Sequence, residues 1–308
     1  IPTDGRPGEN TRIHARQTRL NLDVHSAAAC DDVRLFIESD FFGSGDSLRL
    51  RHAFFESGGF LAGQTWSTFM DESILPNTLD FESPRSVILD RRGLLRLTVP
   101  ATERLEFAIA VEDPQGLFDQ DSAPPGGVEQ LAPDLVTRTR YETTWGHLQA
   151  AGLVRLLRFR ADSGDSDDAV GWGFNFTGRV NRTDSDGLLF QVAFGEGIES
   201  YRQGADAAVN AAGDLEVLPV TAWIVGYEVD WTERASSTLV YSAANVDNAP
   251  FQAPTAGNEF EYLAANVIFR PRPRFSWGIE YLFGSRTDFD NARGEAHRMQ
   301  VSFRYDLP

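Results

Sequence analysis

Arginine is the residue type in this chain with the clearest chemical potential. All 28 basic residues are arginine, and the 308 residues contain no lysine. A guanidinium group is a planar, permanently charged fork that binds carboxylates and phosphates through two parallel hydrogen bonds. Seven arginines of the first third are candidate anion-binding residues: Arg16, Arg34, Arg49, Arg51, Arg92, Arg96 and Arg104. Four more follow in the middle of the chain: Arg138, Arg140, Arg155 and Arg179.

Carboxylates accompany these arginines. Glu38 and Asp40 belong to the alternating segment 33–42, and Glu56 ends a strand-like run. Segments 48–56 and 60–69 form a hairpin around the tight turn 57–59, and a long connection, 70–84, follows. Four carboxylates lie in this connection: Asp71, Glu72, Asp80 and Glu82. If these carboxylates lie opposite the arginines across the narrow part of a pore, they would create a transverse electric field there. In the alternative interpretation, these charges only pair off and hold the loop in place.

Patterns for covalent or metal chemistry are absent. The five histidines are scattered without ligand spacing, and the sequence has no Gly-x-Ser-x-Gly or glycine-rich phosphate-binding motif. The single cysteine, Cys30, permits no internal disulfide. The acidic runs 162–168 and 184–186 lack the spacing of an EF-hand, so we interpret them as solvated loops. We therefore expect no catalytic residue, no metal and no cofactor. The net charge of −17, without a basic run, argues against nucleic acid as a partner.

The elements that carry these residues have the period of β-strands. In segment 170–181, Val170, Trp172, Phe174 and Phe176 share one face, while Gly, Asn, Thr and Arg residues occupy the other. The connections between such segments alternate in length. Short ones lie at 182–187, 233–235 and 271–273, and long ones at 161–169, 201–218, 247–258 and 287–295. This alternation is typical of an up-and-down barrel with short turns at one rim and long loops at the other.

The distribution of apolar residues favours a membrane barrel. No stretch approaches the roughly 20 apolar residues of a transmembrane helix, but barrel strands need only alternate ones. Aromatic residues recur near strand ends, as aromatic girdles at membrane interfaces do; among them are Trp145, Trp172, Trp223, Trp231 and Trp277. The sequence predicts an all-β protein: one transmembrane antiparallel up-and-down β-barrel domain over residues 1–308. Its polar lumen would be narrowed by a constriction loop at about 70–84.

Two other functions remain open. A secreted soluble β-sandwich could bind carbohydrate through aromatic platforms such as Trp172 and Trp277. An outer-membrane hydrolase could place a serine and a histidine on the barrel exterior, for which His52 near Ser57 is the only starting point. Extraction separates the first of these from a porin, because a porin needs detergent and a soluble protein does not.

Several motifs resemble the DcaP-like family of Gram-negative outer-membrane porins. They are RLRHAFFE (49–56), GQTWSTFMD (63–71), LPNTLDFESP (75–84), RQTRLNLDV (16–24) and ESDFFG (38–43). The resemblance implies a sixteen-stranded, trimeric barrel in the outer membrane, in contact with lipid and lipopolysaccharide. It also implies passive diffusion of small, mostly anionic solutes such as dicarboxylates, with the loop after an early hairpin folded into the pore.

The sequence departs from this family pattern at both ends. About fifteen strands are visible, whereas bacterial single-chain barrels normally have an even number. Family members carry a further strand before a PTDG-like segment, so we expect this chain to be truncated at its N-terminus. The last residues, Tyr305-Asp306-Leu307-Pro308, do not end on the aromatic residue that is common in outer-membrane strands.

Overall fold

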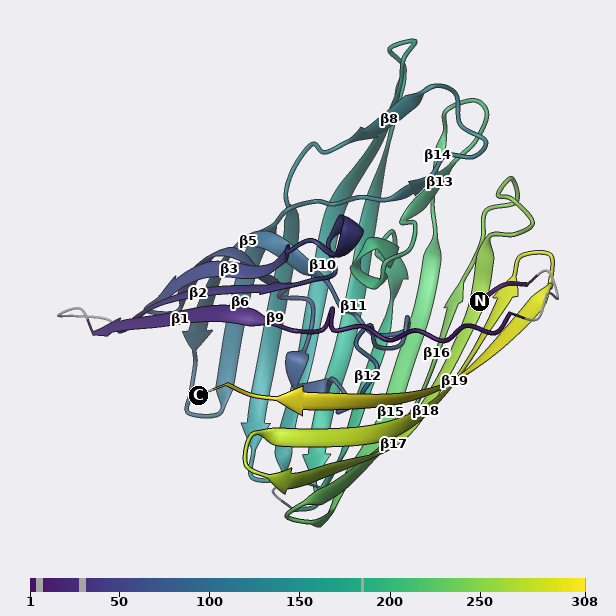
Figure 1. Cartoon of the computed structure of the whole chain (residues 1–308). Helices are drawn as coiled ribbons and strands as arrows, with labels where there is room; N and C mark the ends of the chain where they lie inside the picture. Colours follow the sequence, from purple (N-terminus) through teal and green to yellow (C-terminus); the bar gives the residue numbers. More distant parts are fainter. Residues whose placement is uncertain (4–7, 28–31, 184–185, 308) are drawn as a thin grey trace.

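The main antiparallel sheet has 16 strands, and fifteen of them form one continuous order in which each strand pairs with the next (Figure 1). The structure, a computed structural model, describes residues 1–3, 8–27, 32–183 and 186–307; Cys30, Asp184 and Ser185 lie outside the described residues. The strands of this order are β1 (Leu20–Ala27), β2 (Asp32–Asp40), β3 (Arg49–Ser57), β4 (Phe60–Trp66), β5 (Arg91–Pro100), β6 (Leu105–Glu112), β9 (Asp134–Thr143), β10 (Gly146–Ala161), β11 (Ser166–Asn181), β12 (Gly187–Glu196), β15 (Pro219–Thr232), β16 (Ala235–Val246), β17 (Gly257–Arg272), β18 (Phe275–Asp288) and β19 (Arg293–Tyr305).

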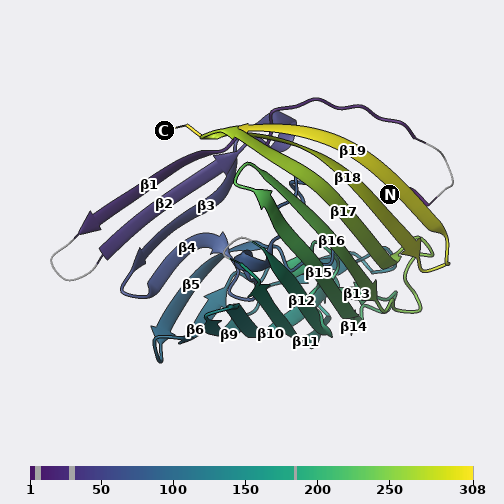
Figure 2. The same ribbon diagram turned by 90° about the horizontal axis from the view of Figure 1, so that it is seen from below.

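The sheet has the form of a barrel wall. Figure 2 shows it curving round from β1, through β9 and β10, to β19. Because fifteen strands alternate in direction, β1 and β19 at the two ends of the sheet order run the same way. This single continuous sheet is the all-β barrel fold that the sequence predicts, and it has no two-layer sandwich. No helix in the described part of the chain is long and apolar enough to cross a membrane.

Alternation along each strand separates an apolar outside from a small or polar inside. On β11, Trp172, Phe174 and Phe176 are 36%, 54% and 45% exposed, whereas Asn175 and Thr177, which alternate with them, are buried. Large apolar side chains on the outside and polar ones within suit a barrel that faces lipid.

The connections follow the predicted alternation, with two differences. The turn between β3 and β4 is closed by Gly58 and Gly59, whose positive φ angles (56° and 82°) suit a two-residue hairpin turn. Long connections follow β4, β6, β12 and β16, and several of them rise at the upper rim in Figure 1. The predicted long loops 161–169 and 287–295 are instead tight turns between extended strands, β10 with β11 and β18 with β19. Their acidic residues are compatible with strand structure because cross-strand pairs such as Arg158 with Asp168 (2.5 Å) hold them.

Further short elements lie within the long connections. The strands β7 (Phe118–Asp119), β13 (Ala207–Val209) and β14 (Leu215–Val217) form a small second sheet, and β8 (Gly126–Glu129) pairs with β10. The 3-10 turns are η1 (Ser44–Asp46), η2 (Glu72–Ile74) and η3 (Glu199–Arg202).

Part of the inner wall is apolar, which the sequence did not predict. Ile74 and Val87 of the connection after β4 pack on inward-facing wall residues; these are Leu189, Ile224, Val240, Ala264 and Leu282. Beside them, Phe69, Met70 and Ile88 pack with Ile198 and Tyr201 of the connection after β12. The apolar core of this protein therefore lies inside the barrel, between the wall and the segments folded against it.

Candidate functional site

The connection between β4 and β5, residues 67–90, lies against the inner wall of the barrel; we call it the inserted loop. Its first contact with the wall is to β6, where the backbone N–H of Thr68 donates to Glu112 (2.7 Å). The side chains of Asn175 and Gln149 then donate to the carbonyls of Phe69 (2.8 Å) and Met70 (3.0 Å). The inserted loop thus crosses to β10 and β11 within four residues of its start.

Asp71 is the first charged anchor of the inserted loop. Its carboxylate accepts from Thr177 Oγ1 (2.6 Å), lies 2.8 Å from His147 Nε2 and pairs with Arg140 at 3.2 Å. Burial would raise the pKa of this carboxyl, but the hydrogen bonds from His147 and Thr177, together with the charges of His147 and Arg140, hold it at about 2, below the ordinary 3.8. Asp71 therefore remains a carboxylate throughout the physiological pH range.

We expect this anchor to withstand mild acid. Because the folded-state pKa of Asp71 lies below its ordinary value, its stabilising contribution is complete above about pH 4 and is lost as the pH falls through about 2. Single-channel conductance should stay level from neutral pH to about pH 4 and change only below it. The variant Asp71→Asn should show at neutral pH the conductance that the wild type reaches in acid. A wild-type transition well above pH 4 that is absent from Asp71→Asn would contradict this assignment.

The middle of the inserted loop is held mainly through its backbone. Glu228 accepts from the N–H of Asn77 (2.7 Å), and Glu280 accepts from those of Leu79 and Asp80 (2.8 Å each). The side chain of Asn266 donates to the carbonyl of Asn77 (2.9 Å). These contacts carry the inserted loop across β15, β17 and β18.

The tip of the inserted loop reaches both ends of the sheet. Asp80 accepts from Tyr262 of β17 (3.1 Å) and pairs with Arg298 of β19 (2.5 Å). The ring of Phe81 stacks on Phe42, which follows β2, with centroids 4.5 Å apart and planes 5° apart. Glu72 and Glu82 are exposed. Of the four predicted loop carboxylates, two are therefore anchors to the wall and two face solvent.

The predicted arginines of β2 and β3 pair with carboxylates of the same wall. Arg51 is buried and contacts Glu38 (2.6 Å) and Asp40 (3.0 Å), and Arg49 contacts Asp40 at 2.7 Å. Near the start of β2, Arg34 pairs with Asp23 of β1 (2.9 Å). Glu38 and Asp40 thus hold arginines instead of standing free in the lumen.

Two predicted arginines lie outside the strands. Arg16 belongs to a turn before β1, where it pairs with Asp46 (2.8 Å) and lies over the ring of Phe42. Arg104 is exposed in the turn between β5 and β6. The sequence pattern predicts strands that start at Arg12 and at Arg104. It therefore assigns Arg16 and Arg104 to strands that in the structure begin later, at Leu20 and Leu105.

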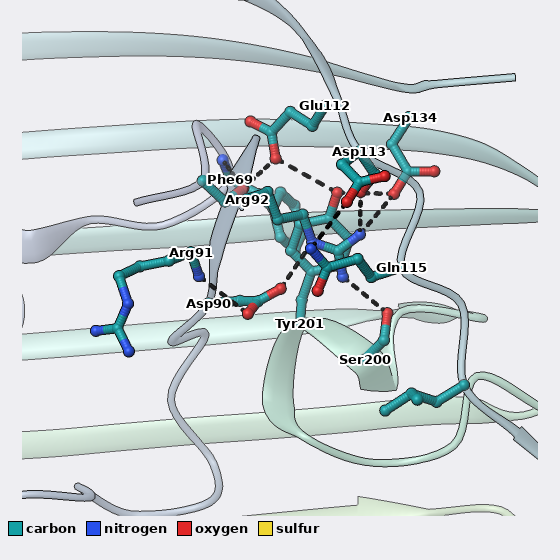
Figure 3. A network of polar contacts seen from close by, with 12 residues as sticks. Phe69, Asp90, Arg91, Arg92, Glu112, Asp113, Gln115, Asp134, Ser200 and Tyr201 are labelled. Atoms are coloured by element: carbon teal, nitrogen blue, oxygen red, sulfur yellow. Dashed lines mark hydrogen bonds and ion pairs between the residues drawn. The ribbon is translucent and has the colours of Figure 1, made fainter. Parts of the chain in front are cut away.

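Arg92 of β5 is at the centre of a buried charge network, shown in Figure 3. It contacts Asp90 (2.7 Å), Asp134 (3.0 Å) and Ser200 Oγ (3.0 Å), and its guanidinium lies 3.6 Å from the ring centroid of Tyr201. A buried guanidinium group is costly unless opposite charges and hydrogen bonds compensate it, and these contacts supply both.

Arg155 of β10 completes this network. It contacts Asp134 (3.2 Å) and Asp206 (3.0 Å), and Tyr201 donates to Asp134 (2.9 Å). Burial raises the pKa of Asp206, opposed by the charge of Arg155. The network fastens the connection after β12, residues 197–218, to the wall beside the inserted loop. The sequence placed Arg92 and Arg155 correctly on strands but gave no sign of Ser200, Tyr201 or Asp206, because these partners come from a distant loop.

The two polar residues of the hydrolase hypothesis do not form an external site. His52 is buried, its Nδ1 lies 3.0 Å from Thr65 Oγ1, and its ring packs edge-on against Trp66. Within the described residues, no group of three or more His, Cys, Asp or Glu residues could hold a metal ion.

Comparison with known structures agrees with this architecture. The crystal structure of the outer membrane channel DcaP of Acinetobacter baumannii matches with a TM-score of 0.89 and 24% identity, over 98% of this chain and 88% of that one. The anion-selective porin from Comamonas acidovorans matches at 0.62 and 10% identity (93% and 88% covered). The trimer form of OmpT of Vibrio cholerae matches at 0.61 and 11% (93% and 90%). These likenesses show the fold.

Sequence comparison identifies the family. No curated protein matches the chain, but the sequence model described as DcaP outer membrane protein matches residues 6–307. The chain therefore belongs to the DcaP outer membrane protein family and is an outer-membrane porin of Gram-negative bacteria.

Proposed function

We propose that this porin is a passive diffusion channel for small hydrophilic solutes, that it prefers anions, and that the inserted loop narrows its lumen. The whole chain acts as one barrel domain, without a covalent step or a cofactor. Solutes of the dicarboxylate class fit this function, because two separated carboxylates can contact two guanidinium forks.

One observation carries the anion preference. The loop carboxylates Asp71 and Asp80 are already bound to wall residues, whereas Arg91 and Arg96 on β5 have no ion-pair or side-chain hydrogen-bond partner among the described residues. Arg91 lies over the ring of Trp66, 4.6 Å from its centroid. Guanidinium groups that are not held in an ion pair attract anions in a pore. Exposed carboxylates such as Glu82 oppose this effect, so the preference is weak.

The net charge of −17 does not oppose this proposal, because much of it lies outside the lumen. Asp162 and Asp165 are exposed in the turn after β10, and Asp214 is hydrogen-bonded within the turn between β13 and β14. Charges at this distance from a pore act weakly, since the Debye length at physiological salt is about 8 Å.

The protein works as a homotrimer embedded in lipid and lipopolysaccharide. The outer surface supports this: exposed Trp172, Trp223, Tyr227 and Tyr281 give it the interfacial aromatic residues of a membrane barrel. A trimer form is known for OmpT of Vibrio cholerae, which shares the fold.

The test is the reversal potential of the purified protein in a planar bilayer with a KCl gradient. We expect a modest potential of the sign set by chloride permeation, and a larger one at low ionic strength because screening is weaker there. The variant Arg91→Gln should move the potential toward the cation side, while Arg104→Gln, in the exposed turn, should leave it unchanged. A clear cation preference of the wild type would overturn the proposal.

A further inference from the structure

We propose that Arg96 of β5 and Arg138 of β9 form an anion-binding subsite on the inner wall, which holds one carboxylate or phosphate group of a solute. This inference rests on the proposed anion-preferring channel and names one position in the lumen at which an anion binds. It concerns two arginines that neither the charge network nor the anchors of the inserted loop use.

The register of the sheet brings these two side chains to the same patch of wall. Arg96 lies opposite Ala110 of β6, and Arg138 lies opposite Ala108 of the same strand. Both have the inward phase, since Arg92, Leu94 and Val136, two or four residues away, are buried. With neighbouring strands about 4.8 Å apart, β5 and β9 are roughly 10 Å apart. Two arginine side chains can converge across that gap.

Strand β6 leaves space between them. Ala108 and Ala110 are the two inward residues that separate the arginines, and a methyl group is the largest side chain either presents. The two guanidinium groups carry like charges and therefore repel each other across β6. An anion placed between these two cations, above the methyl groups of Ala108 and Ala110, would contact both guanidinium groups.

The donors of both groups are incompletely used. Arg96 is half-buried and has no side-chain hydrogen bond or ion pair with any described residue. Arg138 binds Glu106 through Nη2, but its Nε is buried and has no hydrogen-bond partner. A buried charged donor without a partner is costly, so an oxyanion that accepts from both groups would relieve this cost.

Three carboxylates face the subsite, and they set its strength. Glu106 contacts Arg138, while Glu56 and Glu112 act on Arg96 through their charges. Glu56 is aligned with Arg96 across β4 through Leu61 but forms no ion pair with it. Glu112 is occupied by Ser67 and by the backbone of Thr68. Glu106, paired with Arg138, and Glu56, which has no ion pair with any described residue, are thus the carboxylates that compete with a bound anion.

The subsite adjoins the start of the inserted loop. Val136, the next inward residue of β9, packs in the cluster that contains Phe69 and Met70. On the other side of Arg138, Arg140 contacts Asp71. An anion held here would lie against the wall beside the first anchor of the inserted loop.

The experiment measures the half-blocking concentration of two probes, inorganic phosphate and acetate, on the chloride current of the purified porin in planar bilayers. Arg96→Gln should raise this concentration about tenfold for both probes, the loss of one charge-assisted contact. Glu56→Gln should lower it several-fold, because a competing charge is removed. Arg104→Gln is the matched control and should equal the wild type.

Each outcome decides the question. Equal half-blocking concentrations in Arg96→Gln and the wild type would overturn the subsite, as would an unchanged or higher value in Glu56→Gln. If Arg96→Gln does not fold, the Glu56→Gln result alone decides. An effect on phosphate without one on acetate would assign the subsite to phosphate groups, and the reverse to carboxylates. The wild-type reversal potential, recorded in the same bilayers, separates failure of the subsite from failure of the anion-preferring channel.

Discussion

Replacing residues 72–84 of the inserted loop with a short Gly-Ser linker is expected to increase single-channel conductance several-fold. These residues form a layer along the wall from β11 to β19, and the tip contacts Phe42 after β2. Their removal would widen the cross-section of the lumen, which governs ion flow through a water-filled pore. Conductance in symmetric KCl, recorded from single insertions, gives the measurement.

The replacement retains Asp71 and the segment 85–90, so that the anchors at both ends of the loop persist. The control variant Glu82→Gln changes an exposed charge at the tip and should alter selectivity with little effect on conductance. Heat-modifiable migration of both variants in detergent gels shows that the barrel has formed. A folded loop replacement with wild-type conductance would mean that the inserted loop does not limit the passage.

Removing one carboxylate from the buried network should cost more stability than any exposed substitution. Asp134→Asn removes the carboxylate that both Arg92 and Arg155 contact. Among the described residues, each arginine then keeps a single carboxylate partner, Asp90 for Arg92 and Asp206 for Arg155. Breaking a buried ion pair on one side costs about 3–5 kcal/mol. We expect a decrease of that size in the free energy of unfolding, measured by urea titration in lipid vesicles.

Two variants calibrate this result. Tyr201→Phe removes one hydrogen bond to Asp134 and should cost about 1 kcal/mol. Asp162→Asn, in an exposed turn, should have almost no effect. Equal losses for Asp134→Asn and Asp162→Asn would show that the network contributes little to stability.

The alternation of apolar and polar residues predicted the strands of the wall well. Each strand has to present apolar side chains outward and polar ones inward, and this requirement can be read within the strand itself. Segment 170–181 is a clear example, and its predicted faces match β11. The lengths of the strands were less predictable. Strand pairing continues through much of segment 161–169, where cross-strand charges replace apolar contacts, and a pattern based on apolar residues ends too early there.

The interior was predictable only in part. The inserted loop was recognised from its length and its break in pattern, and Asp71 and Asp80 from their charge. Its apolar partners, such as Leu189 and Ile224, have inward phase on strands where the sequence predicts a polar lumen. Tyr201 approaches Arg92 from more than 100 residues away, a separation that a single sequence does not bridge. Local pattern therefore identifies walls, while contacts between loops and walls require the folded chain.

The way in which the wall holds the inserted loop has a consequence for how such channels diversify. Glu228, Glu280 and Asn266 recognise N–H and carbonyl groups of the backbone, which nearly every amino acid supplies. The course of the loop is thus encoded largely in the barrel. Exposed side chains of the loop, Glu72 and Glu82 among them, are free to vary without moving the segment that presents them. For the proposed loop-narrowed lumen, substitutions at the tip would change what passes through the channel, while the barrel that positions the loop stays constant.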